Sequence, residues 1–324
     1  MVIELPGLVD LQVNGFGGID FNAPDLTADR VSDALERIRE TGVTRCLPTL
    51  VTSSLERFVH NARVLSKASD RAVAGIHMEG PYLSPEDGPR GAHPREFVTP
   101  ASIDDFNCRQ EAAGGRIVLV TLAPEVPGAL PLIEHLAASG VRVALGHTAA
   151  TSRQILDAIS SGATLATHLG NGCAQMLPRH PNIIWELLAA DALSASLIAD
   201  GCHLPPATLK AMVRAKGPGR TMLVTDAVAA AGCAPGRYTL GGVTCELGDD
   251  GRVSLPGTPY LAGSSLTLPR AIANTVRFTG LPLETVIPMA STIPASFLGT
   301  TTAGTITADW DAEKAELRVL RVTR

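Results

Sequence analysis

The chain has 324 residues and a mass of 33.7 kDa, a length that fits one large α/β barrel or two smaller domains. Apolar residues make up 45% and charged residues 18%, so a sizeable core can form and a disordered chain is excluded. With 27 basic against 32 acidic residues the net charge is −5, which argues against a nucleic-acid partner. No run approaches the length of about eighteen apolar residues that spans a membrane. The start MVIELPGLVD lacks the layout of a signal peptide, so we expect a cytoplasmic protein with no membrane partner.

Six cysteines are spread along the chain without a C-x-x-C pair, which is unlike a zinc ribbon or a disulfide scaffold. Most of them are predicted to be small buried side chains. Cys173 and Cys202 lie beside the motifs described below, but their sequence context assigns them no role.

Eight short apolar segments are bounded by turn residues: Leu8–Val13, Thr44–Val51, Val73–Met78, Ile117–Leu122, Val141–Leu145, Thr164–Thr167, Ala195–Ala199 and Met222–Thr225. Most are nearly continuous in hydrophobicity, which is typical of strands covered on both faces of a parallel sheet. Helical patterns lie between them, and Thr99-Pro100 and Thr151 are predicted helix starts. The alternation predicts a (β/α)8 TIM-like barrel over residues 1–303, although a doubly wound open sheet has the same local pattern.

The pattern changes over residues 229–262, where two alternating segments flank Gly241-Gly242. This is typical of a β-hairpin, so we expect a β insertion after the eighth strand. Residues 304–324 form a β-like tail with two strand-like runs around Trp310. Two strands alone are marginally stable in water, so the tail is expected to pack on the barrel or on another chain.

Nearly every predicted strand ends in an ionisable or metal-competent residue: Gln12, Asn14, His77, Glu79, His147, His168, Asp200, His203 and Asp226. In a parallel barrel the carboxyl ends of all strands open on one face, where active sites lie. A single histidine after a strand is more often a structural residue. Because such residues recur at the ends of several predicted strands, a functional site is favoured.

A catalytic zinc ion needs three histidine or carboxylate ligands and one open position. Glu79, His147 and His168 supply such a set, and Asp226 is a candidate acid–base group beside it. The structural alternatives are a helix N-cap for Asp226 and a turn residue for Glu79, which precedes Gly80-Pro81.

Nine motifs together resemble those of the N-acetylglucosamine-6-phosphate deacetylases, a family of the amidohydrolase superfamily. In chain order they are Gln12-x-Asn14, His77-x-Glu79-Gly80-Pro81, Gly91-Ala92-His93-Pro94, Leu122-Ala123-Pro124-Glu125, Gly146-His147-Thr148, Thr167-His168-Leu169, Ala199-Asp200-Gly201-x-His203, Thr225-Asp226-Ala227 and Leu261-Ala262-Gly263-Ser264. Each motif alone is weak, but nine in the family's order, spanning residues 6–299, are specific.

The resemblance implies that Glu79, His147 and His168 hold a catalytic divalent metal ion, with zinc expected. Many amidohydrolases begin with His-x-His and bind a second metal ion there, whereas this chain has Gln12-x-Asn14, as the one-metal deacetylases do. Neutral amides are poor zinc ligands, so one metal ion is expected.

The same comparison implies roles for further residues. Asp226 resembles the general base that takes a proton from the attacking water and returns one to the departing amine. His203 resembles the residue that polarises the acetamide carbonyl, and His93 one that contacts the sugar. Asn171 and Arg179 fall where the family contacts the substrate phosphate. The arginine often comes from a neighbouring subunit, so a functional homodimer is expected.

Three departures from the family pattern are visible. Gly170-Asn171-Gly172-Cys173 replaces the usual apolar residue followed by Asn-Ala-Met, so side-chain contacts to the sugar are lost. No acidic residue follows Arg179, and its guanidinium suits a carboxylate as well as a phosphate. The first barrel strand begins almost at residue 6, so the family's β-sandwich is expected to be absent or reduced to the tail.

Three functions follow from these observations. The favoured one is hydrolysis of the acetamide of an N-acetylated amino sugar, with the 6-phosphate expected. The second keeps the metal and Asp226 but hydrolyses another amide, such as an N-acyl amino acid or a cyclic amide, with Arg179 holding a carboxylate. The third is a catalytically silent barrel that binds a ligand.

Overall fold

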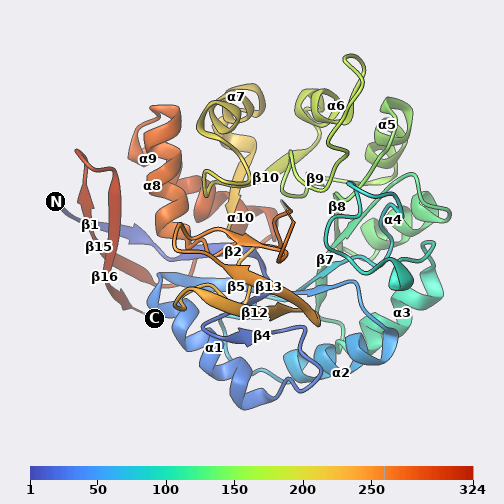
Figure 1. The fold of residues 1–324 in the computed structure, drawn as a ribbon, viewed down its shortest axis with the longest axis horizontal. Helices are drawn as coiled ribbons and strands as arrows, with labels where there is room; N and C mark the ends of the chain where they lie inside the picture. The colour runs from blue at the N-terminus through green and yellow to red at the C-terminus, as the bar shows by residue number, and fades with distance from the viewer. Residues whose placement is uncertain (259, 324) are drawn as a thin grey trace.

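A computed structural model describes residues 1–258 and 260–323. Eight parallel strands surround its centre in the order in which they occur along the chain (Figure 1). They are β2 (Leu8–Val13), β5 (Val43–Val51), β6 (Ile76–Glu79), β7 (Ile117–Leu122), β8 (Arg142–Leu145), β9 (Leu165–Ala166), β10 (Ser194–Ile198) and β11 (Thr221–Val224). Each overlaps one of the eight apolar segments, so the predicted barrel is confirmed. Strand β2 is buried at all six positions, as expected for a strand covered on both faces.

Helices follow the strands and form the outer ring (Figure 1). They are α1 (Ala28–Glu40), α2 (Leu55–Ser66), α3 (Ile103–Ala112), α4 (Ala129–Ala138), α5 (Ser152–Ser161), α6 (Ile183–Ala189), α7 (Pro206–Lys216) and α8 (Leu268–Thr279), followed by the short α9 (Leu283–Val286) and α10 (Thr292–Phe297). In α1 the buried positions Val31, Ala34, Leu35 and Ile38 recur at helical spacing, which turns one face to the strands.

The barrel is closed by hydrogen bonds between the first and last strands. The Asp226 amide donates to the Gln12 carbonyl at 3.0 Å, and the Asn14 amide donates to the Ala227 carbonyl at 2.7 Å. Side chains add to this seam, because the Thr225 hydroxyl donates to Oδ2 of the buried Asp10 at 2.6 Å. The closure places the ends of β2 and β11 side by side.

The segment after β11 forms a small antiparallel sheet of β12 (Gly236–Leu240), β13 (Val243–Leu247) and β14 (Val253–Ser254). Gly241 and Gly242 join the first two strands with φ angles of 58° and 90°, both in the region that a tight hairpin turn requires. The sheet lies across the barrel in Figure 1. The β insertion expected from the sequence is therefore present.

A third sheet joins the two ends of the described chain (Figure 1). Strand β1 (Val2–Pro6) pairs with β15 (Thr305–Asp311), which pairs with β16 (Glu316–Thr323). The tail thus gains a third strand from the N-terminal residues, and Trp310 and Ile306 join the same core cluster as the barrel. Two further two-residue strands, β3 (Gly15–Phe16) and β4 (Ile19–Asp20), pair beside β2.

One expected helix start is wrong. Helix α3 begins at Ile103 with Ser102 as its N-cap, not at Thr99-Pro100. The Thr99 amide donates to the Pro81 carbonyl and the Ala101 amide to the Pro127 carbonyl, so these residues are held by neighbouring loops instead of entering the helix. Thr151 does cap α5, with a reciprocal bond to Gln154. Within the described ranges, the helices include none whose length and apolar character would let it cross a membrane.

Candidate active site

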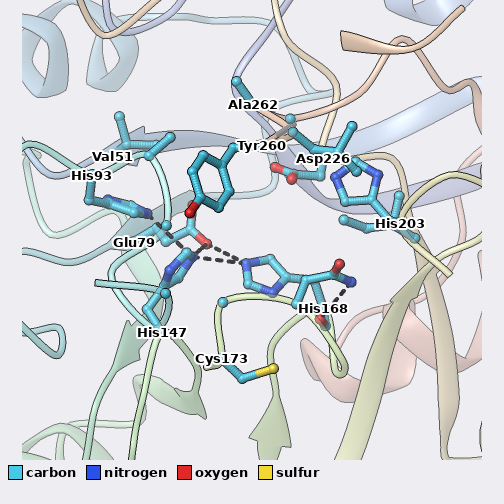
Figure 2. A pocket seen from close by; sticks show the side chains of 18 of the residues that line it. Val51, Glu79, His93, His147, His168, Cys173, His203, Asp226, Tyr260 and Ala262 are labelled. Atoms are coloured by element: carbon cyan, nitrogen blue, oxygen red, sulfur yellow. Dashed lines mark hydrogen bonds and ion pairs between the residues drawn. The ribbon is translucent and has the colours of Figure 1, made fainter. Parts of the chain in front are cut away.

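A cavity of about 520 Å³ opens at the carboxyl ends of the barrel strands. It is large enough for a small organic ligand. Figure 2 shows Glu79, His93, His147 and His168 directed toward one centre, with Asp226 and His203 beside them. The polar residues at the strand ends therefore converge, as expected for this face of a barrel.

The three predicted metal ligands meet through one atom each. Oε1 of Glu79 lies 3.0 Å from Nε2 of His168 and 3.3 Å from Nε2 of His147, and the two Nε2 atoms lie 3.1 Å apart. All three side chains are buried. Neighbouring ligand atoms around a tetrahedral zinc ion, with bonds of 2.0–2.2 Å, lie about 3.3 Å apart. The triangle thus has the dimensions that a single small cation requires.

The chemistry of this donor set also fits a metal ion. Nδ1 of His147 lies 2.9 Å from the carbonyl oxygen of Pro89. In the tautomer that is protonated at Nδ1, this nitrogen donates to that oxygen, and Nε2 keeps a lone pair for a metal ion. Burial alone would raise the pKa of Glu79, but hydrogen bonds and positive charge from His147 and His168 hold that pKa well below its usual value. Glu79 therefore stays ionised, as a metal ligand must.

Two amide side chains from β2 and its end hold the carboxylates of the site. Nε2 of Gln12 donates to Oε1 of Glu79 at 2.9 Å and to Oδ1 of Asp226 at 3.2 Å. Nδ2 of Asn14 donates to the same Oδ1 at 2.7 Å. These amides thus direct N–H groups at oxygen atoms, which is the opposite of what a second metal ion would need from them.

Asp226 has the environment of an acid–base group. Burial and the negative charge of Glu79 raise its pKa to about 6. The hydrogen bonds that it receives from the described residues end on Oδ1, so Oδ2 remains available to the cavity. Its backbone is left-handed, with a φ of 51°, and His147 (50°) and His168 (28°) share this feature. Such conformations are uncommon for residues other than glycine and concentrate at functional sites.

His203 is fixed by its neighbour Asp200. Nδ1 of His203 lies 2.6 Å from Oδ2 of Asp200, and Oδ1 of Asp200 accepts two backbone N–H groups. Burial favours the neutral acid, but the hydrogen bond from His203 and its charge lower the pKa of Asp200. The aspartate thus orients the imidazole and leaves Nε2 for the cavity that His203 lines.

The three predicted substrate-binding residues are placed differently. His93 lines the cavity with Nε2 3.3 Å from Nε2 of His147, and Asn171 lines it with Nδ2 bonded to the His168 carbonyl at 3.2 Å. Arg179 is exposed and does not line the cavity of its own chain. Cys173 lines the cavity, Cys202 is exposed, and all six cysteines are free.

The cavity also contains residues that were not anticipated from the sequence, among them Thr52, Arg252 and Tyr260. The Thr52 hydroxyl lies 2.9 Å from Nδ1 of His93 and fixes that ring. Arg252 and Tyr260 reach the cavity from the β insertion. No sequence signal marks the last two, because only the folding of the insertion over the barrel brings them to the site.

Comparisons with known proteins agree with this geometry. Residues 3–317 match the amidohydrolase family. The chain is 38% identical over 311 residues to the N-acetylglucosamine-6-phosphate deacetylase of Bos taurus, covering 92% of this chain and 75% of the relative. It is 36% identical over 301 residues to the N-acetylgalactosamine-6-phosphate deacetylase of Escherichia coli O157:H7, covering 91% of this chain and 78% of the relative.

The same relationship appears among solved structures. A mutant N-acetyl-D-glucosamine-6-phosphate deacetylase from Mycobacterium smegmatis, in complex with N-acetyl-D-glucosamine-6-phosphate, superposes with a TM-score of 0.91 at 31% identity. The match covers all of this chain and 86% of the other. The chain belongs to the amidohydrolase family and, within it, to the N-acetylglucosamine-6-phosphate deacetylases.

Proposed function

We propose that the protein hydrolyses the acetamide of N-acetylglucosamine 6-phosphate, releasing acetate and the amino sugar phosphate. The observation that carries this proposal is the convergence of Glu79, His147 and His168 beside Asp226 in a cavity of ligand size. The similarity to deacetylases of phosphorylated N-acetyl amino sugars supports the substrate class.

We infer that one divalent cation, zinc, is bound by Glu79, His147 and His168. A cation bound there supplies Lewis-acid chemistry for an amide carbonyl and lowers the pKa of water. The donor directions of Gln12 and Asn14 support a single ion, since both amides give hydrogen bonds to Asp226 where a second ion would sit. Imidazole and carboxylate ligands in a compact triangle favour zinc over the larger, oxygen-seeking calcium ion.

The chain's own residues account for the proton transfers. Oδ2 of Asp226 takes a proton from the attacking water as general base and returns one to the departing amine as general acid. Nε2 of His203, oriented by Asp200, donates a hydrogen bond to the acetamide oxygen as negative charge develops on it. His93 and Asn171 contact the sugar and its phosphate from the cavity wall.

N-acetylgalactosamine 6-phosphate is the second candidate substrate, because a relative of nearly equal similarity is named for it. Amine release from the two sugar phosphates and from unphosphorylated N-acetylglucosamine separates the possibilities. We expect the highest kcat/KM with N-acetylglucosamine 6-phosphate. Release from an N-acyl amino acid or a cyclic amide, with none from any amino sugar, would contradict the proposal.

We also propose that the active form is a homodimer in which Arg179 reaches the partner subunit's cavity. Arg179 is exposed and does not line the cavity of its own chain, and two residues near it in the sequence, Met176 (90%) and Trp185 (55%), are also exposed. Co-expression of Asp226→Asn and Arg179→Ala chains tests this. Mixed dimers contain one cavity with both residues intact, so they should regain activity that neither variant has alone. No gain in isolated mixed dimers would contradict a contribution across the interface.

The six free cysteines favour a reducing compartment, so we propose the cytoplasm as the location. Fractionation of the source cells, followed by detection of the protein in each fraction, tests this.

A further inference from the structure

We propose that Asp20 and Arg57 are positioning residues of the active site, which together form a clasp on the turn of the β insertion at Gly241 and hold this turn as a wall of the cavity. The consequence for the sugar rests on the proposed function, whereas the clasp itself is measured without turnover.

The turn between β12 and β13 borders the cavity although it lies outside the barrel. Leu240, Gly241 and Val243 line the cavity from this turn, and Val51 lines it from the end of β5. Figure 2 shows Val51 among the side chains around the site. A Cβ atom at Gly241 would come within 3.2 Å of Cγ2 of Val51, so the turn packs closely on the end of a barrel strand. The position of the turn therefore sets one boundary of the cavity.

Asp20 binds the amide side of the turn. Its side chain is buried, and its Oδ2 accepts the N–H of Gly241 at 2.8 Å. Its Oδ1 accepts the N–H of Asn22 at 2.8 Å. Burial raises the pKa of Asp20 to about 6, although these two N–H groups oppose the increase, so the carboxyl group is mostly ionised at neutral pH. Both hydrogen bonds are then charge-assisted.

Arg57 binds the carbonyl side of the same residue. Nη1 of Arg57, in the first turn of α2, donates to the Gly241 carbonyl at 2.7 Å. A Cβ atom at Gly242 would lie 3.1 Å from this nitrogen, so the guanidinium also packs against the second glycine of the turn. Gly241 is thus held at its N–H and at its carbonyl by charged side chains that come from β4 and α2.

Hydrogen bonds through Asn22 connect the clasp to the barrel. Oδ1 of Asn22 accepts the N–H of Val51 at 2.9 Å, and Nδ2 of Asn22 donates to the Thr49 carbonyl at 3.0 Å. Because the N–H of Asn22 also donates to Asp20, the end of β5 and the turn of the insertion are bound to the same loop. Asp20 therefore fixes the distance between the turn and the strand that faces it across the cavity wall.

Hydrogen exchange of wild type, Asp20→Asn and Arg57→Ala tests the clasp without a substrate. Asp20→Asn keeps the shape of the side chain but directs an NH2 group at one of two N–H donors, and Arg57→Ala removes the donor to the Gly241 carbonyl. In either variant the amides of residues 238–245 should exchange roughly 10- to 100-fold faster, the factor that the loss of one charge-assisted hydrogen bond represents. Exchange in α4 and α5, which carry neither residue, should stay as in wild type.

Steady-state kinetics with N-acetylglucosamine 6-phosphate tests the role at the active site. KM should rise roughly 3- to 10-fold in either variant, because the sugar must order a turn that is no longer fixed. The kcat value should change less than about twofold, since the metal ligands and Asp226 are untouched. The zinc content per chain should equal that of wild type.

The matched controls are Asp33→Asn on α1 and Arg63→Ala on α2, two exposed residues that do not line the cavity. Both should leave exchange and KM as in wild type. Wild-type exchange of the turn in either test variant, or faster exchange with an unchanged KM, would overturn the proposal. If Asp20→Asn exchanges faster throughout the chain, its whole fold is weakened, and Arg57→Ala alone decides.

The two measurements separate this inference from the proposed reaction. If the turn exchanges faster in both variants but wild type deacetylates no amino sugar, the proposed reaction fails and the clasp stands. If wild type deacetylates the sugar phosphate while both variants keep its exchange and its KM, the clasp fails and the reaction stands.

Discussion

Asp226 combines three unusual features at one position: a left-handed backbone, a half-buried carboxyl group with a raised pKa, and two amide donors on the same carboxylate oxygen. A residue that only capped a helix would need none of them. Together they fix one oxygen and present the other to the cavity, which is the arrangement that a general base requires.

Replacing Asp226 with Asn should therefore greatly reduce turnover but keep the metal site. The substitution preserves size and removes the proton acceptor, so kcat should fall by roughly 10²- to 10⁴-fold. Zinc content, measured by elemental analysis, should stay near one ion per chain. Asp104→Asn, at an exposed position of α3, is the matched control and should behave as wild type. Near-normal kcat in Asp226→Asn would show that another group is the base.

The pH profile should report the same carboxyl group. Burial and Glu79 raise the pKa of Asp226 to about 6, and a cation bound at Glu79 moves it downward. The base must be ionised, so log kcat/KM should fall with a slope of one as the pH decreases below the pKa of Asp226. With the cation bound, that pKa should be no higher than about 6. An acid limb centred above pH 7, or activity unchanged down to pH 3, would contradict this assignment.

The metal ligands could be predicted from the sequence because they sit at strand ends, which a parallel barrel brings to one face whatever its loops do. The sequence did not predict three other cavity residues, Thr52, Arg252 and Tyr260. Their approach to the cavity depends on how a loop and the β insertion fold. The exposed position of Arg179 likewise follows from tertiary structure and not from its motif.

At the scale of elements, the joint between β2 and β11 contains a buried, hydrogen-bonded carboxyl group. Asp10 is buried within it, and burial raises its pKa to about 7, although the hydroxyl and amide of Thr225 and the Gln12 amide oppose the increase. Because Asp226 follows Thr225 directly and Gln12 lies two residues after Asp10, the joint that closes the barrel also positions the site.

Thr225→Val should weaken this joint. The variant keeps the shape of the side chain but leaves Oδ2 of Asp10 without its donor, so the free energy of unfolding should fall by about 1–3 kcal/mol. Urea denaturation measures it, with Thr239→Val on the exposed side of β12 as the control. Equal stability of the two variants would mean that the Asp10 bond contributes nothing to closure.

Strands were easier to predict than helix starts. A doubly covered strand must be apolar along its whole length, so its sequence marks its bounds closely, as Leu8–Val13 and Ile117–Leu122 do. A helix start depends on what binds the residues before it. The amides near Thr99 bond to loops that are distant in sequence, so local capping preference placed the start of α3 several residues early.

At the scale of the whole molecule, the barrel and the sheet β1–β15–β16 share one core. Ile306, Trp310 and Leu317 from the sheet belong to the same buried cluster as the barrel strands. The small sheet is therefore part of the folded unit, and its strands should not unfold separately from the barrel.

The two tryptophans allow a test. Trp310 is buried in the small sheet, and Trp185 is exposed on α6. In a Trp185→Phe variant the fluorescence reports the sheet alone, and circular dichroism reports the barrel helices. The two urea transitions should coincide, as expected for one cooperative unit. A fluorescence transition at clearly lower urea would show that the sheet is an independent module.

Anomalous diffraction at the zinc edge, from crystals of the wild-type protein grown with zinc, tests the central claim most directly. A single strong peak should lie about 2.0–2.2 Å from one oxygen of Glu79 and from Nε2 of His147 and His168. No peak bound by these three residues, or a second peak of equal height held by Gln12 and Asn14, would contradict it.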